Sequence, residues 1–133
     1  MKQRRLTLAL LPETLAVSRL EAKAQVPVWA WSGPVVSITR AQVELCIVRE
    51  DAAVPSHVIC QRGFRCLRVL GRLDFAETGV LESMAEPLAR AGISIFALST
   101  YGTDYLRLPD GNLNAAVSAL SEAGHAVHRR VSP

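Results

Sequence analysis

Residues 93–108 constrain the fold more than any other part of this sequence, because they read as two short strands joined by a polar turn. A helical pattern precedes them over residues 78–91, and another follows over residues 110–123. Strands are also predicted before the first helix, over residues 64–70, and after the second, over residues 125–131. The resulting order of strand, helix, strand, strand, helix, strand predicts an α+β fold, in which both helices cover one face of a small antiparallel sheet.

Apolar side chains recur along one stripe in each predicted helix, as expected of helices that pack on a sheet. Gly92 follows the first helix and Gly124 follows the second, at the position where glycine is favoured as a helix stop. Pro87 lies inside the first helix and is expected to kink it, because proline has no N–H to donate to the carbonyl of Ser83. The stripes consist of Val80, Leu81, Met84, Leu88 and Ala91 in the first helix and of Leu113, Ala116, Val117 and Leu120 in the second.

The sequence contains a weak internal repeat with an offset of 60 residues, in which the apolar pattern matches although few residues are identical. A shared pattern at constant spacing is typical of two copies of one supersecondary unit, and chance alignment of short strands is the alternative. We therefore expect two units, residues 1–60 and residues 61–133. The matching pairs are residues 5–10 with 65–70, 35–40 with 95–100 and 43–48 with 103–108.

The first of these units departs from the pattern where its helices should be. Residues 15–20 are rich in β-forming side chains and Pro27 follows them, so we expect an extra strand and then one helical turn over residues 28–31. The second helix of this unit is reduced to residues 51–54, because Pro55 ends it. This unit is therefore expected to keep its strands and to lose most of its helical structure.

Composition indicates a folded protein with a hydrophobic core and says little more about the class of protein. Half of the 133 residues are apolar, and the net charge of +3 comes from bases that are scattered except near the two ends. Such terminal charges are typical of solvated chain ends, so we expect no nucleic-acid partner. The three cysteines form no CxxC pair, which favours neither a zinc site nor a disulfide framework, and free thiols fit a cytoplasmic protein. No apolar stretch is long enough to cross a membrane, and residues 6–11 read as a strand rather than a signal peptide.

Two strings in the second unit resemble the ACT domain family. They are Thr-Gly-Val-Leu at residues 78–81 and Ser-Thr-x-x-Thr-Asp-Tyr at residues 99–105. The resemblance covers residues 64–127 strongly, and it covers residues 6–54 loosely as a degenerate ACT unit. The sequence is most similar to the branch shared by small stand-alone bacterial proteins and the cytosolic arginine sensors of animals. It is less similar to the regulatory domains of aspartate kinases.

This resemblance implies a ferredoxin-like βαββαβ fold, present as a tandem pair with a degenerate first unit. It also implies a non-catalytic regulatory or sensor protein that binds a free amino acid or similar small zwitterion, without a metal or cofactor. Because ACT units pair with one another in the family, we expect a homodimer, and we expect its output to pass through a regulated partner protein. The resemblance places near the ligand Asp74, Phe75, Thr78, Gly79, Val80 and Leu81, then Ile93, Ser94 and Ile95, and also Ser99 and Thr100.

The start of the first helix is suited chemically to an amino acid. Backbone N–H groups without helical partners can donate to the ligand carboxylate, and Gly79 has no side chain to obstruct a close approach. Asp74 could accept hydrogen bonds from the ligand ammonium group, and Thr78 could donate or accept one. Helix capping is an equally good interpretation of Asp74 and Thr78, and the two roles are compatible.

Three other functions compete with amino-acid sensing. An interaction module that kept the ACT fold and lost its ligand would bind another protein through the open sheet face, which residues 93–99 predict to be partly apolar. RNA recognition requires stacking aromatic residues within a basic surface, and only Phe64 and Tyr105 are candidates. A small enzyme would need clustered ionisable groups, but no histidine accompanies the polar turn at residues 99–104. The interaction module is therefore kept as the alternative.

Overall fold

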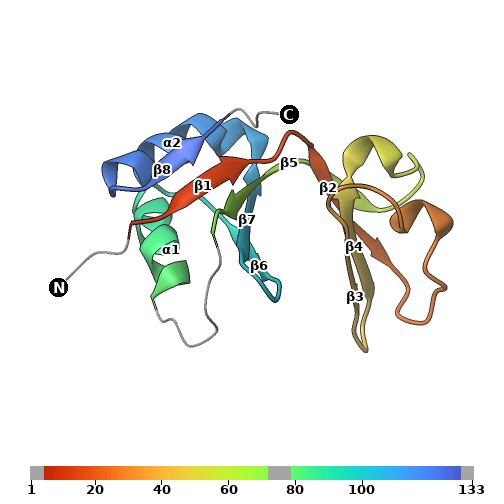
Figure 1. Ribbon diagram of the computed structural model, residues 1–133. Helices are drawn as coiled ribbons and strands as arrows, with labels where there is room; N and C mark the ends of the chain where they lie inside the picture. Colours follow the sequence, from red (N-terminus) through yellow and green to blue (C-terminus); the bar gives the residue numbers. More distant parts are fainter. Residues whose placement is uncertain (1–4, 72–78, 130–133) are drawn as a thin grey trace. The chain divides into compact units, whose positions relative to one another are not determined.

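The computed structural model describes residues 5–71 and 79–129, and the chain divides into two compact units. One consists of residues 1–12 and 65–133 and is called the two-helix unit. The other consists of residues 13–64 and is called the inserted unit, because its sequence lies between the two parts of the first. Figure 1 shows the elements of both units along the chain.

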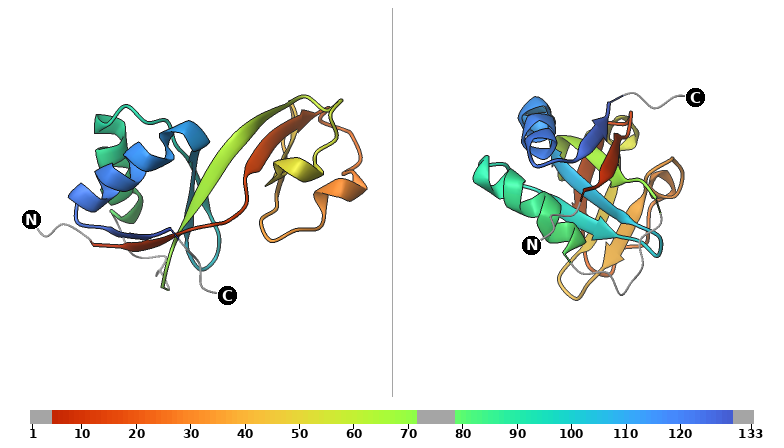
Figure 2. Two further views of the ribbon diagram at one scale, coloured as in Figure 1. Left: turned by 90° about the horizontal axis from the view of Figure 1, so that it is seen from above. Right: turned by 60° about the vertical axis from the view of Figure 1, so that its left-hand side comes forward.

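The two-helix unit contains a sheet with the strand order β6-β7-β5-β1-β8. Its helices, α1 and α2, contact each other and cover one face of this sheet (Figure 2). The sequence from β5 to β8 has the predicted βαββαβ order, so the ferredoxin-like α+β fold is confirmed. The elements are β1 (Thr7–Leu10), β5 (Cys60–Val69), α1 (Val80–Arg90), β6 (Phe96–Ser99), β7 (Asp104–Pro109), a 3-10 turn η3 (Asp110–Asn112), α2 (Leu113–Glu122) and β8 (Ala126–His128).

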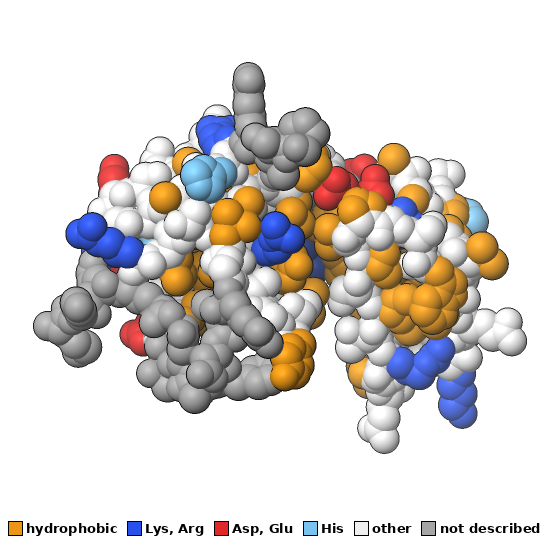
Figure 3. Space-filling model, in the orientation of Figure 1, with side chains coloured by type: hydrophobic (Ala, Val, Ile, Leu, Met, Phe, Trp, Pro, Cys, Tyr) orange, Lys and Arg blue, Asp and Glu red, His pale blue; other side chains and the backbone are white. Residues whose placement is uncertain are grey.

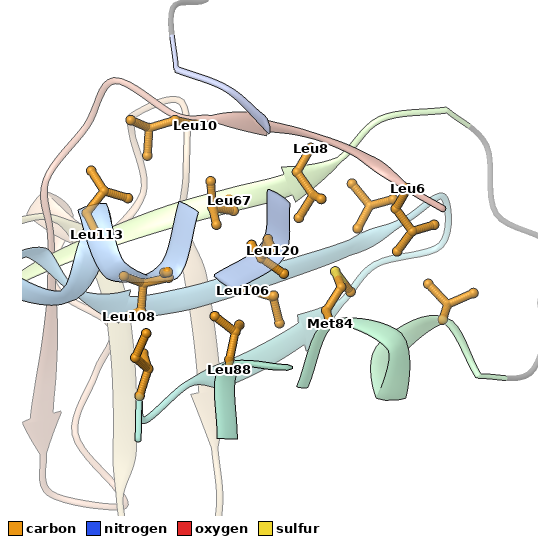
Figure 4. Packing of buried hydrophobic residues seen from close by; sticks show 14 residues of the cluster. Leu6, Leu8, Leu10, Leu67, Met84, Leu88, Leu106, Leu108, Leu113 and Leu120 are labelled. Atoms are coloured by element: carbon orange, nitrogen blue, oxygen red, sulfur yellow. The ribbon is translucent and has the colours of Figure 1, made fainter. Parts of the chain in front are cut away.

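Leucine side chains from every layer of this unit form its hydrophobic core (Figure 4). Alternate residues of a strand face the same side of a sheet, and Leu67 and Val69 of β5 therefore both lie under the helices. Met84 and Leu88 come from the predicted stripe of α1 and are fully buried. Gly92 follows α1 with φ of +74°, a left-handed conformation that favours glycine, so the predicted helix stop is confirmed.

His125 compensates for a proline inside α1. The helix runs through Pro87, which cannot donate to the carbonyl of Ser83 four residues earlier. The Nε2 atom of His125 lies 2.9 Å from that carbonyl oxygen and donates to it. The N–H of Leu6 donates to Nδ1 of the same ring at 3.0 Å, which fixes the neutral tautomer with its proton on Nε2. The buried ring therefore connects α1 to the start of β1.

The inserted unit has the strand order β3-β4-β2-β5, to which β5 contributes its N-terminal half. A small core forms around Ala30, Leu45 and Ile47. The expected strand over residues 15–20 and the single turns near residues 28 and 51 are confirmed. The elements are β2 (Leu15–Leu20), a 3-10 turn η1 (Val28–Ala30), β3 (Ser37–Arg40), β4 (Leu45–Glu50) and a second 3-10 turn η2 (Asp51–Ala53).

Arginine side chains hold the loops of this unit where the repeat pattern would require helices. The guanidinium of Arg40 donates to the carbonyl oxygens of Ala22 and Ala24. Arg62 donates in the same way to the carbonyls of Asp51 and Val54. These bonds satisfy backbone oxygens in the irregular segments.

The division of the chain differs from the expected boundary between residues 60 and 61, which falls inside β5. β1 belongs to the two-helix unit, where Leu8 pairs antiparallel with Val69 and parallel with Val127. Leu8 and Leu10 of β1 fill the core beneath the helices, and this burial places the strand there. Among the described residues, no helix is long and apolar enough to span a membrane.

Candidate ligand-binding site

A hollow of about 450 Å³ opens where the sheet of the two-helix unit ends. One side of the hollow is the C-terminal end of β5 and the residues that follow it, and the other is the turn between β6 and β7. It is lined by Arg68, Val69, Leu70 and Gly71 from the first side and by Thr100, Gly102, Thr103 and Tyr105 from the second. The start of α1 lies at the same end of the sheet (Figures 1 and 2).

Hydroxyl groups hold the β6–β7 turn in place. The Thr103 hydroxyl donates to the carbonyl of Val69 at 2.8 Å and so ties the turn to the end of β5. Both the backbone N–H and the hydroxyl of Thr100 donate to the carbonyl of Thr103, at 2.9 and 3.2 Å. Ser99 donates to a carboxylate oxygen of Asp104 at 2.6 Å. Each of these hydroxyls thus uses its hydrogen within the protein and keeps acceptor lone pairs.

Arg68 supplies the charge of the hollow. Its neighbours Leu67 and Val69 lie in the core, so strand alternation places Arg68 on the sheet face opposite the helices. On that face it is half-buried and lies beside Ala9 of β1, a small residue. Among the residues described, no carboxylate lines the hollow, and the guanidinium of Arg68 has no ion-pair or hydrogen-bond partner. The hollow therefore carries positive charge.

The start of α1 offers a second set of donors. Gly79 is the N-cap residue with φ of +79°, and as a glycine it has no side chain with which to cap the helix. The N–H of Ser83 donates to the Gly79 carbonyl at 3.0 Å, which is the first helical bond. The N–H groups of residues 80–82 precede it and have no acceptor within the helix. The exposed glycine leaves the approach to them open.

The residues expected near a ligand are divided between the hollow, the hydrophobic core and the exposed surface. Thr100 lines the hollow, whereas the side chains of Val80 and Ile93 belong to the hydrophobic core. Ile95 packs against this core, Ser94 and Leu81 are exposed, and Ser99 is bonded to Asp104. Asp74, Phe75 and Thr78 lie outside the described residues.

Sequence reasoning did not identify Arg68 as a site residue. The available signal was a single cation inside the apolar run Cys66-Leu67-Arg68-Val69-Leu70, where a buried strand would carry none. Thr103 and Tyr105 were part of the string that resembled the ACT family, but only the tertiary structure places them against the end of β5.

A second hollow, of about 880 Å³, lies in the inserted unit. It is lined by residues 19–24, Val43 and residues 57–59, and both Val43 and Ile59 are largely exposed. Hydrophobic side chains also gather on the surface of this unit in the view of Figure 3. Charges of both signs occur in its lining, on Arg19, Glu21 and Lys23, so it presents no consistent charge to a ligand.

Comparisons with known proteins agree with this architecture. The profile of the ACT domain family matches residues 59–122, and another profile, described as an N-terminal domain, matches residues 13–57. An Agobacterium tumefaciens protein of known crystal structure is 34% identical over 97% of this chain and 96% of its own, with a TM-score of 0.92.

Two further structures share the fold at low identity. One is a Vibrio cholerae protein of unknown function, described as a possible transport protein, with 16% identity, a TM-score of 0.71 and 90% of each chain covered. The other is the regulatory subunit of aspartate kinase from Thermus thermophilus in its ligand-free form. It is 12% identical, with a TM-score of 0.61 over 87% of this chain and 96% of its own.

The family profile and the topology of the two-helix unit describe the same part of the chain. The profile begins one residue before β5 and ends with α2, and these bounds enclose five of the six elements of the βαββαβ order. The chain is an ACT domain protein and belongs to the same family as the Agobacterium tumefaciens protein.

Proposed function

We propose that this protein is a non-catalytic regulator that binds a free amino acid or a similar small zwitterion. The observation that carries the proposal is the end of the two-helix sheet, where Arg68 and hydroxyl oxygens line a hollow. A guanidinium suits a carboxylate, and threonine oxygens with free lone pairs suit an ammonium group. A zwitterion therefore finds both kinds of partner at this place.

The start of α1 extends this site in our proposal. The N–H groups after Gly79 would donate to a carboxylate, an arrangement favoured at helix N-termini. Among the other predicted residues, Asp74, Phe75 and Thr78 are proposed to contribute from the segment between β5 and α1. The fold shared with a regulatory subunit of aspartate kinase supports a regulatory rather than a catalytic role.

We infer that the protein is cytoplasmic and acts as a homodimer on a partner protein. β6 supports the dimer, because among the described strands it pairs only with β7 and both its faces are exposed. Phe96 and Leu98 on this strand are 51% and 44% exposed. An edge strand with apolar side chains and no charge is suited to pairing with another strand.

The same edge favours the second candidate function, a protein interaction module without a ligand. In that case β6 would bind an extended segment of a different protein by adding it to the sheet. The inserted unit would then be a degenerate ACT unit that supports the fold. Under both candidate functions, we keep the proposal that this protein is related to the ACT branch that includes the animal arginine sensors.

Thermal unfolding in the presence of each common amino acid separates the two functions. A ligand that binds only the folded protein raises its melting temperature according to its concentration and affinity. Sensing predicts a rise with at least one amino acid, confirmed by calorimetric titration. No shift and no heat with any amino acid would refute the sensor and leave the interaction module.

A further inference from the structure

We propose that the hollow of the inserted unit is a second ligand site, which binds an amino acid with an apolar side chain. The hollow has a volume of about 880 Å³, within the range of about 300–1,000 Å³ that is usual for small-molecule sites. All the residues that line it belong to the inserted unit, so this site does not involve the hollow beside Arg68. The inference therefore goes beyond the proposed function and does not depend on it.

The chain at the end of β2 alternates between the floor of this hollow and its rim. Leu20, Ala22 and Ala24 are apolar and half-buried and form the floor, whereas the residues between them are charged and exposed. Val43, in the turn between β3 and β4, and Ile59, just before β5, extend the apolar lining. These two side chains are 76% and 75% exposed, so an apolar ligand that covers them removes hydrocarbon surface from water.

Hydrogen bonds hold the walls of the hollow in place. The Arg40 guanidinium donates to the carbonyl oxygens of Ala22 and Ala24. The N–H of Arg19 donates to the carbonyl of Ile59 at 2.9 Å, which joins the end of β2 to the residue before β5. The hollow is therefore preformed, and binding does not require its walls to become ordered first.

Charges of both signs at the rim suit the two charged groups of a free amino acid. Arg19, Glu21 and Lys23 are exposed there, and none of the three forms an ion pair with another described residue. The ligand carboxylate can bind either cation, and Glu21 can accept hydrogen bonds from the ligand ammonium group. A further charge on the ligand side chain would lie against the apolar floor, where burial without a partner is unfavourable. The hollow therefore favours amino acids with aliphatic or aromatic side chains.

Calorimetric titration of the full chain with L-leucine and with L-asparagine tests the apolar preference. The two amino acids are similar in size and differ mainly in the polarity of the side chain. We expect L-leucine to bind about 10-fold or more tightly, the range for a leucine side chain that leaves water. N-acetyl-L-leucinamide has the same side chain without the two charges, and it is expected to bind more weakly than L-leucine because the rim then has no charged partner.

Variants of two exposed valines locate the binding. Val43→Ser removes an apolar side chain of the lining and is expected to weaken L-leucine binding by about 3-fold or more. Val28→Ser is the matched control, because Val28 is 89% exposed in the same unit but does not line the hollow. Its affinity for L-leucine is expected to equal that of the wild type, and circular dichroism confirms that each variant is folded.

The same titrations in an Arg68→Met chain separate this site from the hollow of the two-helix unit, which then lacks its cation. Binding of L-leucine that persists in this chain and is weakened by Val43→Ser supports the second site. Equal affinity for L-leucine and L-asparagine, or equal effects of Val43→Ser and Val28→Ser, overturns it. Loss of L-leucine binding on Arg68→Met also overturns it, because binding then belongs to the hollow of the two-helix unit and supports the proposed function. Absence of binding by every amino acid overturns both proposals.

Discussion

Replacing His125 by leucine should expose the energetic cost of Pro87 within α1. In the native protein the ring donates to the Ser83 carbonyl and accepts from the Leu6 N–H, and it is only 5% exposed. Leucine is apolar and of similar size, so it fills the space but makes neither bond. The carbonyl has no substitute donor in the helix, because Pro87 occupies the position four residues later.

The expected loss follows from the two groups that remain. A buried polar group without a partner costs about 1–3 kcal/mol, so two such groups cost roughly 2–6 kcal/mol. Burial of the leucine side chain offsets about 1 kcal/mol of this sum. We therefore expect His125→Leu to lower the free energy of unfolding by roughly 1–5 kcal/mol. A domain of this size is commonly stable by about 5–15 kcal/mol, so the variant should still fold.

A double-mutant cycle isolates the role of the proline. Pro87→Ala restores an N–H four residues after Ser83, and that N–H can donate to the same carbonyl. In this background His125→Leu orphans only the Leu6 N–H, so its cost should fall by about 1 kcal/mol or more. Urea unfolding of the four proteins, followed by circular dichroism, measures the coupling. The slope of each transition shows whether the same surface unfolds in every variant.

Additive effects of the two substitutions would refute this account. They would mean that His125 contributes to stability only through its packing or its bond to Leu6. They would also mean that water or another group donates a hydrogen bond to the Ser83 carbonyl.

Three further predictions concern stability and assembly. Gly92→Ala should lower the free energy of unfolding by about 1 kcal/mol, because residue 92 has φ of +74° and a residue with a side chain is strained in this left-handed region. Gly111→Ala is the control, because φ of Gly111 does not lie in that region. An equal loss in both variants by urea unfolding would contradict the reasoning. Leu106→Ala should cost about 2–5 kcal/mol, since this fully buried side chain of β7 leaves a cavity under both helices; a loss below about 1 kcal/mol in the same assay would show that the core collapses around it. Leu98→Lys should shift the proposed homodimer toward monomer in native mass spectrometry, because it places a charge on the apolar edge strand β6. The control variant Leu81→Lys, at an exposed position of α1, should leave the dimer intact. A dimer that survives Leu98→Lys would place the interface elsewhere.

Local patterns were sufficient to predict most elements of this chain. The polar turn after Ser99 and the apolar alternation around it predicted the β6–β7 hairpin, and the stripe through Met84 and Leu88 predicted α1. Residues 15–20 were predicted as a strand with the same bounds as β2. These predictions hold because backbone periodicity and the side chains that tolerate it are properties of neighbouring residues.

Partnerships between distant residues could not be predicted in this way. The pattern at residues 6–11 indicated a strand but not its sheet, and burial of Leu8 among helices from the other end of the chain decided that β1 joins the two-helix unit. The residues around His125 indicate no partner for it, whereas the fold brings it to Leu6, 119 positions away, and to Ser83. No local signal encodes either contact.

The candidate site shows the same division. The sequence alone determined the order of strands and helices, the glycine before α1 and the likeness to an amino-acid-binding family. Tertiary structure decided that Arg68, rather than Val80 or Ile93, faces a hollow, because strand register and the choice of buried face determine which side chains remain available. Strand register depends on many long-range contacts together, and no single stretch of the sequence contains all the residues that make them.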